Sequence, residues 1–482
     1  MRPSRLFLAA TALATSGVLF AQLRTLNPRD VAESQRLHPQ LIEEYGGAES
    51  GPRAAYVESV GRRVAATSGI GQSLRFTALN SAVENAFAQP GGYVYVTRQL
   101  MGLMNDEAEL GFVLGHETGH IAANHSQARK KASTRNSIIG VLGAVLGSAV
   151  GVDAIGSLIS QGAQLRTLSF SRAQEYQADQ LGIRYLSAAG YDPLASRSML
   201  AALSRSSALE ARVQGRDNRS TPEWAQTHPL NENRLRQAAT MAQRSPRAGT
   251  GVRNRDVYLA QIDGLIIDDD PAQGVIDGRS FIHPDLRLQF VVPAGFQMQN
   301  SASAVTVAGG SGQAQFSAGR FNGDFGDYIG RVLEGLTGGR TRLALSPLQR
   351  TTVNGLPAAF VTGRAQTSSG VVDVSVMAYR FDANTAYHFV MVTPGGQGMR
   401  PFASMLDSLR RISPAEAAAI RPRVIDVLTV RRGDTVASLA ARMAYRDFRV
   451  ERFVSLNGLS SGAPLVPGQK VKLVVYGARV RG

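Results

Sequence analysis

The 482-residue sequence contains no cysteine. This absence excludes disulfide bonds, zinc sites built from thiolates, a cysteine nucleophile and the acylated N-terminal cysteine of a lipoprotein. It fits a compartment in which free thiols would be oxidised. The sequence also lacks the spacing of an EF-hand calcium loop, so we expect the acidic run Asp268-Asp269-Asp270 to form a turn in a linker.

Acidic side chains are in the minority, with 37 Asp and Glu against 52 Lys and Arg, which gives a net charge of +15 carried mainly by arginine. Such a surface suits nucleic acid, anionic envelope polymers or membrane headgroups, and arginine-rich codon composition also accounts for it without any partner. The exported context described next favours the envelope over nucleic acid. The length suffices for about two to four domains with cores of their own.

The first 21 residues have the pattern of a secretory signal peptide. Arg2 and Arg5 precede an apolar run that extends from Leu6 to Phe20. Cleavage after Ala14 or after Ala21 both fit, and an uncleaved membrane anchor is the alternative. In each case the rest of the chain is expected outside the cytoplasm, in the periplasm or cell envelope.

The motif H-E-x-x-H occurs once, at His116-Glu117-Thr118-Gly119-His120, after residues with helical apolar spacing. Positions four apart share one face of a helix, so His116 and His120 can direct two imidazoles at one zinc ion. Glu117 is then placed to take a proton from a zinc-bound water. The alternative is a pair of exposed histidines on a charged helix.

A catalytic zinc usually has three protein ligands, so a third must come from elsewhere. His125 lies five residues past His120 without an intervening glycine, which excludes the metzincin spacing. Glu175 and Asp179 are four apart in a second segment of helical character. One of them can bind zinc while the other accepts the free ring N–H of a liganding histidine, the alternative being a solvated acidic face.

Four ordered motifs between Leu41 and Met241 carry a resemblance: Asn85 to Thr97, H-E-x-x-H, E-x-x-A-D at 175–179, and Thr227-His228-Pro229 with Arg234. They resemble the HtpX/BepA-type gluzincin zinc metalloproteases, family 48 of the metallopeptidases. The resemblance implies one zinc ion held by His116, His120 and Glu175, with Glu117 as the base. It further implies Asp179 as the partner of a liganding histidine, and His228 and Arg234 as residues lining the cleft.

The protease segment is expected to be mainly helical with a small sheet. Residues 55–70 have the spacing of an amphipathic helix, and residues 74–79 and 93–97 have the composition of strands. In gluzincins a sheet edge near the active-site helix accepts an extended substrate. By that analogy, Asn85, Ala86 and Phe87 are candidates for the substrate-binding edge.

His228 has three possible roles. Because it precedes Pro229, it could simply cap a helix. It could also donate to the oxyanion of the tetrahedral intermediate, or occupy the fourth zinc position and keep the enzyme latent.

The apolar stretch 138–159 is long enough to span a bilayer. A single crossing would place His116 and Glu175 on opposite sides of the membrane. Two crossings need about 40 apolar residues plus a turn, whereas 30 residues lie between Arg135 and Arg166. We therefore expect a buried, glycine-rich helical pair; a helical lid that contacts the membrane surface is the alternative.

The C-terminal half changes character. From Phe281, short runs with alternating apolar residues predict antiparallel strands, with helices at 327–336 and 399–409 covering one face of the sheet. This α+β segment weakly resembles PsbP-like domains, and His283 and His388 are expected to be structural. The predicted ranges are 1–21 signal peptide, 30–245 protease domain, 246–280 linker, 281–415 α+β sheet domain and 424–476 LysM-like domain.

Residues 424–476 resemble a LysM module with βααβ order, in which Gly433-Asp434-Thr435 forms the turn and helix cap. The resemblance implies binding of peptidoglycan; a small accessory fold that binds protein is the alternative.

Together these features predict an exported α+β multidomain zinc endopeptidase whose substrates are misfolded or unassembled envelope proteins. The two rival hypotheses are a peptidoglycan peptidase and a latent wall-bound scaffold or chaperone with a closed zinc site. No nucleic-acid partner is expected.

Overall fold

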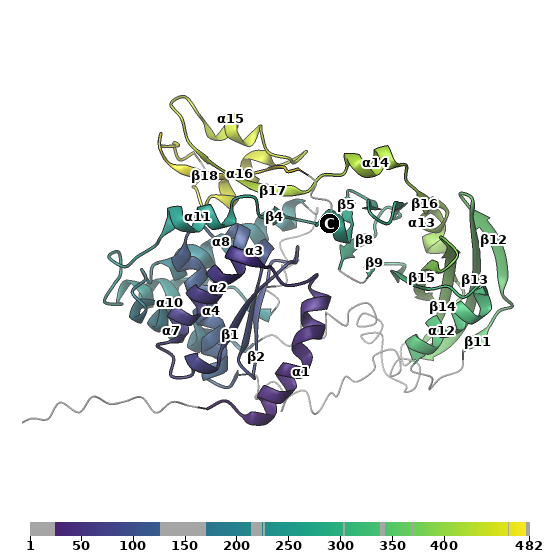
Figure 1. The fold of residues 1–482 in the computed structure, drawn as a ribbon, viewed down its shortest axis with the longest axis horizontal. Coiled ribbons are helices and arrows are strands. Elements are labelled where there is room, and N and C mark those ends of the chain that lie inside the picture. The colour runs from purple at the N-terminus through teal and green to yellow at the C-terminus, as the bar shows by residue number, and fades with distance from the viewer. Residues whose placement is uncertain are drawn as a thin grey trace, which may run out of the picture.

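The computed structural model describes residues 25–125, 170–213, 224, 227–301, 304–337, 343–367, 370–460 and 462–478. The expected signal peptide and the apolar stretch 138–159 lie outside these residues. No helix in the described ranges has both the length and the apolar character needed to cross a bilayer. Figure 1 shows a helical N-terminal part, a separate large sheet and a C-terminal module that lies against the helices.

The N-terminal part consists of helices around a three-stranded sheet of order β1-β3-β2, in which β1 and β3 run parallel and β2 is antiparallel to β3. The elements are α1 (Pro28–Glu44), α2 (Gly51–Ala65), β1 (Arg75–Leu79), β2 (Ala86–Gln89), β3 (Tyr93–Thr97), α3 (Arg98–Leu103), α4 (Glu107–Ala122), α7 (Arg172–Ala188), α8 (Ala195–Val213) and α10 (Glu232–Gln243). The predicted strand 93–97 matches β3, and the helix predicted at 55–70 is α2, which ends five residues earlier.

Helices α4 and α7 pack closely because glycines line their contact. A Cβ atom on Gly182 would lie 2.9 Å from the backbone nitrogen of His116, and one on Gly119 would lie 3.1 Å from the carbonyl oxygen of Ala178. The absence of side chains here lets the two backbones approach, which brings the acidic face of α7 to the histidine face of α4.

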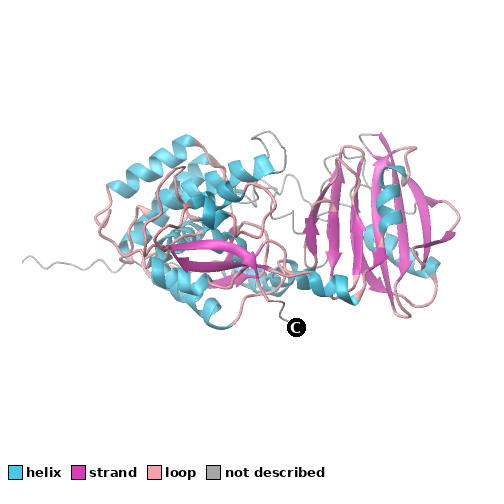
Figure 2. Ribbon diagram, turned by 90° about the horizontal axis from the view of Figure 1, so that it is seen from above, coloured by secondary structure: helices cyan, strands magenta, loops and turns pink. Residues whose placement is uncertain are grey.

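The large sheet has eight strands, and its central strands, residues 370–380 and 385–394, are buried on both faces. Its order is β11-β13-β14-β15-β10-β9-β8, with β12 also paired to β13. Helix α12 covers one face through Phe325, Ile329 and Leu333. The other face packs against a four-stranded sheet, β16-β7-β6-β5, and α13, whereas only helices over one face were predicted. Figure 2 shows strands side by side in this region, with helices packed against them. The elements are β5 (Val275–Asp277), β6 (Ser280–His283), β7 (Leu288–Val291), β8 (Gln297–Asn300), β9 (Val305–Gly309), β10 (Gly312–Arg320), α12 (Phe325–Thr337), β11 (Ala344–Leu345), β12 (Gln349–Val353), β13 (Leu356–Thr367), β14 (Gly370–Arg380), β15 (Thr385–Pro394), α13 (Ala403–Ser408) and β16 (Arg410–Arg411).

The two histidines of this region have local hydrogen bonds. His388 is buried, with Nδ1 2.8 Å from the hydroxyl of Tyr328 and Nε2 3.1 Å from that of Ser317. Burial lowers the pKa of His388 to about 4, so the ring is neutral. The Nδ1 atom of His283 accepts from the backbone N–H of Leu286.

The C-terminal module has the predicted βααβ order. After α14 (Pro414–Ala419) come β17 (Arg423–Thr429), α15 (Val436–Ala440), α16 (Arg449–Leu456) and β18 (Lys470–Tyr476). Thr435 caps α15, as the Gly-Asp-Thr sequence predicts, by accepting from the backbone N–H of Ser438. Strands β17 and β18 pair antiparallel.

This module is docked on the helical part. Its buried Lys472 directs Nζ at three carbonyl oxygens at the end of α3, those of Gly102 at 2.7 Å, Leu103 at 3.2 Å and Met104 at 2.6 Å. A lysine ammonium is a favourable partner for the unpaired carbonyls of a helix C-terminus. One hydrophobic cluster also runs from the N-terminal helices into β18 and α16.

Residues 246–280, expected as a linker, contain ordered elements. Helix α11 (Arg255–Ile262) packs into the N-terminal core, and β4 (Ile266–Ile267) pairs with β17. Asp268 accepts hydrogen bonds from Arg423 and Tyr445 of the C-terminal module. The acidic run therefore connects this segment to the C-terminal module. The partners of Asp268 lie more than 150 residues further along the chain.

Candidate metal centre

Helix α4 carries the H-E-x-x-H motif in the core of the protein. It begins at the N-cap Asp106, whose side chain accepts from the backbone N–H of Glu109 at 3.0 Å. The side chains of His116, Glu117 and His120 are all essentially buried. Their burial rejects the alternative of exposed histidines on a charged helix.

Helix α7 supplies the acidic residues. Ser171 and Gln174 form a capping box that fixes its first turn, so that Glu175 follows directly inside the helix and Asp179 lies one turn further on. Glu175 and Asp179 are 1% and 0% exposed, which rejects the solvated acidic face.

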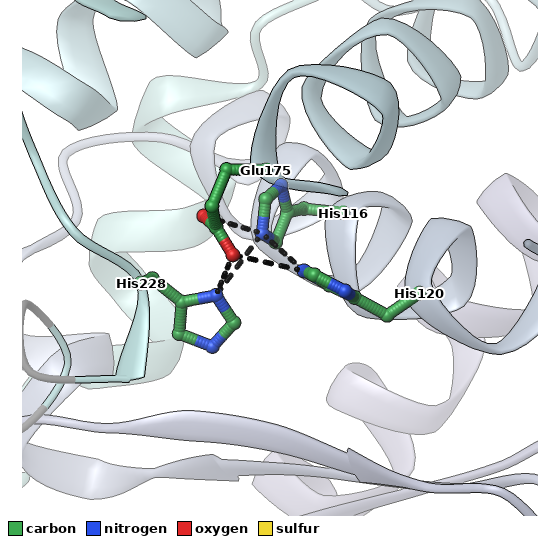
Figure 3. A group of neighbouring side chains, drawn as sticks. All are labelled: His116, His120, Glu175 and His228. Carbon is green, nitrogen blue, oxygen red and sulfur yellow. Dashed lines mark hydrogen bonds and ion pairs between the residues drawn. The ribbon is translucent and has the colours of Figure 1, made fainter. Parts of the chain in front are cut away.

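Four side chains converge on one point (Figure 3). His116 Nε2 lies 3.0 Å from His120 Nε2 and 3.3 Å from His228 Nδ1. Glu175 Oε1 lies 3.4 Å from His120 Nε2 and 3.0 Å from His228 Nδ1. Ligand atoms on a tetrahedral zinc ion are about 3.3 Å apart, given zinc–nitrogen distances of about 2.0–2.1 Å. The four named distances are close to this value and all four ligand atoms lie within 4.8 Å of one another, so the group can hold one metal ion.

The protonation of these residues suits a cation. Burial lowers the pKa of His120 well below its usual value and that of His228 to about 4, so both rings are neutral. Burial alone would raise the pKa of Glu175, but the positive charge of Arg234, with contributions from neighbouring side chains, outweighs burial and holds that pKa well below its usual range. His120 and His228 are thus neutral imidazoles and Glu175 is an ionised carboxylate, the forms that bind metal.

Asp179 fixes the orientation of His116. Its Oδ1 atom lies 2.9 Å from Nδ1 of His116, so that Nε2 of the ring faces the cluster. The Nε2 atoms of His116 and His120 lie 3.0 Å apart, a spacing at which one metal ion can contact both.

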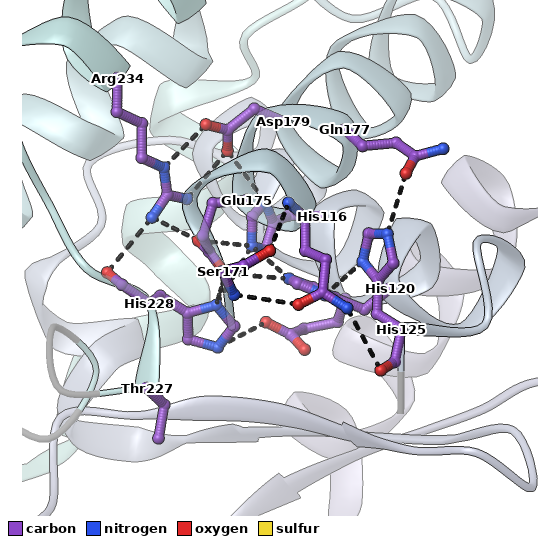
Figure 4. A network of polar contacts seen from close by, with 12 residues as sticks. His116, His120, His125, Ser171, Glu175, Gln177, Asp179, Thr227, His228 and Arg234 are labelled. Carbon is purple, nitrogen blue, oxygen red and sulfur yellow. Dashed lines mark hydrogen bonds and ion pairs between the residues drawn. The ribbon is translucent and has the colours of Figure 1, made fainter. Parts of the chain in front are cut away.

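Arg234 was expected to line the cleft, but it is 1% exposed and contacts the two carboxylates of α7 (Figure 4). Its Nε and Nη2 atoms donate to both oxygens of Asp179 at 2.8 and 2.9 Å, and Nη1 lies 2.5 Å from Glu175 Oε2. Nη1 also donates to the carbonyl oxygen of His228. Arg234 therefore holds the carboxylates of Glu175 and Asp179 in place, and it is buried instead of lining an open surface.

His125, whose spacing from His120 excludes the metzincin pattern, lies beside His120. Its Nδ1 lies 2.9 Å from His120 Nδ1, and its Nε2 lies 3.0 Å from Gln177 Oε1 (Figure 4). The amide oxygen only accepts, so Nε2 of His125 donates and Nδ1 accepts the proton of His120. His125 thus directs Nε2 of His120 at the metal position, because Asn124 adopts a left-handed conformation that ends α4 and turns the chain back.

We expect His125→Ala to lower zinc affinity by about 10–100-fold, because the partner of a liganding histidine sets its tautomer and orientation. Competition for zinc with a chromophoric chelator measures this directly. His283→Ala, which removes a histidine from the separate sheet, should leave zinc affinity unchanged. Equal affinity of the wild-type protein and the His125→Ala variant would contradict the role.

His228 lies between the cluster and Glu117. Its Nδ1 atom faces the ligands, whereas its Nε2 atom lies 3.5 Å from Glu117 Oε1. Trp224 stacks on its ring with centroids 4.1 Å apart. The imidazole thus occupies the side of the cluster on which an attacking water would have to reach Glu117.

The candidate substrate edge lies beside this centre. Strand β2 begins at Ala86 and is the last strand of its sheet among the described residues. Asn85 is hydrogen-bonded to Thr97 of β3 through its carbonyl oxygen, so the backbone groups of Ala86 face the other edge. Phe87 packs with Tyr45 and Tyr95 on the face away from α4.

Comparison with known families gives two matches. Residues 52–242 match the model of peptidase family M48, and residues 428–474 match that of the LysM domain.

Individual relatives are similar to part of the chain. The beta-barrel assembly-enhancing protease of Yersinia pestis is 30% identical over 195 residues, which are 39% of this chain and 38% of that protein. The mitochondrial metalloendopeptidase OMA1 of Schizosaccharomyces pombe is 31% identical over 211 residues, 42% of this chain and 58% of that one. The chain thus spans between about two fifths and three fifths of the length of these relatives. The solution structure of PsbP from Synechocystis sp. PCC 6803 aligns with 29% of this chain and 98% of its own, with 11% identity and a TM-score of 0.23, too low to assign a fold.

Proposed function

Because residues 52–242 form a peptidase family M48 domain and residues 428–474 form a LysM domain, we propose that the protein is an exported zinc metalloendopeptidase of the cell envelope. The observation that carries this proposal is the buried group of His116, His120, Glu175 and His228, with Glu117 beside it. A zinc ion bound there would supply a Lewis acid that polarises a peptide carbonyl and lowers the pKa of water.

Glu117 acts as the general base in this proposal. It takes a proton from the attacking water and passes it to the leaving amine. His116, His120 and Glu175 hold the ion, Asp179 orients His116, and Arg234 keeps Glu175 and Asp179 ionised. A substrate would add as a strand along Ala86 of β2, whose outward backbone groups can pair with it.

The contacts of His228 favour a latent resting state over an oxyanion donor. A donor to the oxyanion should point away from the ligands, toward the position of the substrate carbonyl. Instead, Nδ1 of His228 is within 3.0–3.3 Å of two ligand atoms, as a fourth ligand would be. We propose that His228 closes the site and must be displaced before substrate can react.

We therefore expect His228→Ala to raise casein cleavage by at least about tenfold, because the fraction of chains with an open site would no longer limit turnover. The comparison is made on zinc-loaded wild-type and variant protein with equal zinc content. A fall of about 10²–10³-fold in turnover would instead identify His228 as an oxyanion donor. Absence of cleavage in both proteins would favour the latent scaffold.

The docked LysM domain favours a site of action at the cell wall. LysM domains are glycan-binding folds, and the loops 431–435, after β17, and 462–469, before β18, are largely exposed. The proposed substrates are misfolded or unassembled envelope proteins. A peptidoglycan peptidase remains the second candidate because the same domain would bring stem peptides near. Digestion of purified sacculi, followed by analysis of the released products, separates the two: soluble cross-link fragments would identify the second.

A further inference from the structure

A cavity of about 410 Å³ lies where the peptidase helices, the C-terminal module and the large sheet meet. Helices α3 and α8 and the loop before β2 form one side, α16 and β18 form the other, and Gln299 of β8 contributes from the sheet. The cavity is separate from the metal centre, and none of the proposed catalytic or ligating residues lines it.

The lining is acidic although the chain as a whole is strongly basic. Among the described residues of the lining, three carboxylates, those of Glu84, Glu210 and Asp268, face one guanidinium, that of Arg452. Arg423 pairs with Asp268 at 3.0 Å. Arg452 lies over the ring of Tyr445 and is 3.5 Å from Asp447. Asp268 and Arg452 are thus each compensated by groups of the protein.

Glu84 is different. Its Oε2 atom accepts a hydrogen bond from Ser206 at 2.7 Å, whereas its Oε1 atom is buried and has no hydrogen-bond partner among the described residues. Burial, with a further contribution from the charge of Glu210, raises the pKa of Glu84 to about 7. A buried carboxylate oxygen without a donor is costly, and it marks a position where a ligand could supply one.

We propose that this cavity binds an organic ammonium group, which donates to Glu84 Oε1 and lies against the carboxylate of Glu210. A lysine-type ammonium carries three donors and no acceptor, which suits a lining rich in acceptors. Hydrogen bonds between an ammonium and a carboxylate are about twice as strong as neutral ones. The volume of the cavity, about 410 Å³, is far larger than the roughly 30 Å³ that one water molecule occupies in the liquid. An alkyl chain therefore fits behind the charged end.

The position of Glu84 links this cavity to the metal centre. Its carbonyl oxygen accepts from the backbone N–H of Trp224 at 3.3 Å, and the Trp224 ring stacks on His228. Trp224 is the single tryptophan of the chain, so its fluorescence reports directly on a group in contact with Glu84.

The test is calorimetric titration of the zinc-loaded full-length protein, with tryptophan fluorescence as a second signal. The probes are 1,5-diaminopentane, Nα-acetyl-lysine amide and, as the uncharged isostere, Nα-acetyl-norleucine amide. We expect the ammonium probes to bind at least about tenfold more tightly than the norleucine probe, because only they make the charge-assisted bond. Binding of both ammonium probes would indicate a lysine side chain of a polypeptide, whereas binding of the diamine alone would indicate a free small amine.

Two variants test the location. Glu84→Gln should weaken ammonium binding by at least about tenfold, and Leu209→Phe, which narrows the cavity without touching the carboxylate, should also weaken it. Glu232→Gln removes an exposed carboxylate from α10 and should bind like the wild-type protein. Equal binding of the norleucine and lysine probes, or unchanged binding in a folded Leu209→Phe protein, would overturn the proposal. These measurements need no peptidase activity, so their outcome is independent of the proposed enzymatic function.

Discussion

Glu117→Gln is expected to retain one zinc ion per chain and to lose peptide cleavage by about 10²–10⁴-fold, the contribution typical of general acid–base catalysis. The zinc is retained because the four converging ligand atoms belong to His116, His120, Glu175 and His228, and not to Glu117. The cleavage is lost because an amide of nearly the same shape cannot accept the proton of water. Metal analysis of the purified variant and cleavage of a fluorescent casein measure the two halves of the prediction.

The comparison is best made twice, in the wild-type chain and in the His228→Ala background. If His228 holds the resting chain latent, the wild-type cleavage rate is already low, and the measured fold-loss caused by Glu117→Gln is smaller. In the opened background the full loss should appear. A zinc-loaded Glu117→Gln protein that cleaves at the parent rate in both backgrounds would rule out Glu117 as the base.

Helical periodicity predicts which side chains share a helix face, whereas the choice of Glu175 over Asp179 as a zinc ligand follows only from the family resemblance. His116 and His120 are four apart, as are Glu175 and Asp179, and such spacing leaves few choices of face. The spacing of these residues does not predict that α4 and α7 pack closely together. That approach depends on glycines at the contact, where even a methyl group on Gly182 would touch the backbone of His116.

The local sequence does not reveal the roles of residues that act through tertiary contacts. His125 contacts His120 because the chain turns back at Asn124. The only sequence signal for this turn is one asparagine, a residue type that tolerates the left-handed conformation. Lys472 reaches carbonyls almost 370 residues earlier in the chain, so nothing in its local sequence distinguishes it from a surface lysine. The segment 246–280 likewise has the composition of a linker. Its Asp268 nevertheless binds residues of the C-terminal module that are distant in sequence.

Arg234→Leu should destabilise the zinc-free protein by about 3–5 kcal/mol, the cost typical of removing one partner from a buried ion pair. Arg234 holds two carboxylates, those of Glu175 and Asp179, each of which is at most 1% exposed. Without the guanidinium both charges would stay buried with less compensation. Urea denaturation of the chelator-treated variant measures the free energy of unfolding.

Two further measurements separate this role from a general loss of packing. Arg234→Lys keeps the charge but not the paired donors to Asp179, so its stability should lie between those of the wild-type and Arg234→Leu proteins. Arg236→Leu removes a neighbouring arginine of α10 that is 69% exposed and pairs with the exposed Glu232, and it should leave the unfolding midpoint unchanged. Zinc should restore part of the stability lost in Arg234→Leu, because the ion would compensate Glu175 while Asp179 stays unpaired with arginine. Equal losses in the zinc-free and zinc-loaded forms would mean that Arg234 supports the fold of α10 and not the charge of the metal ligands.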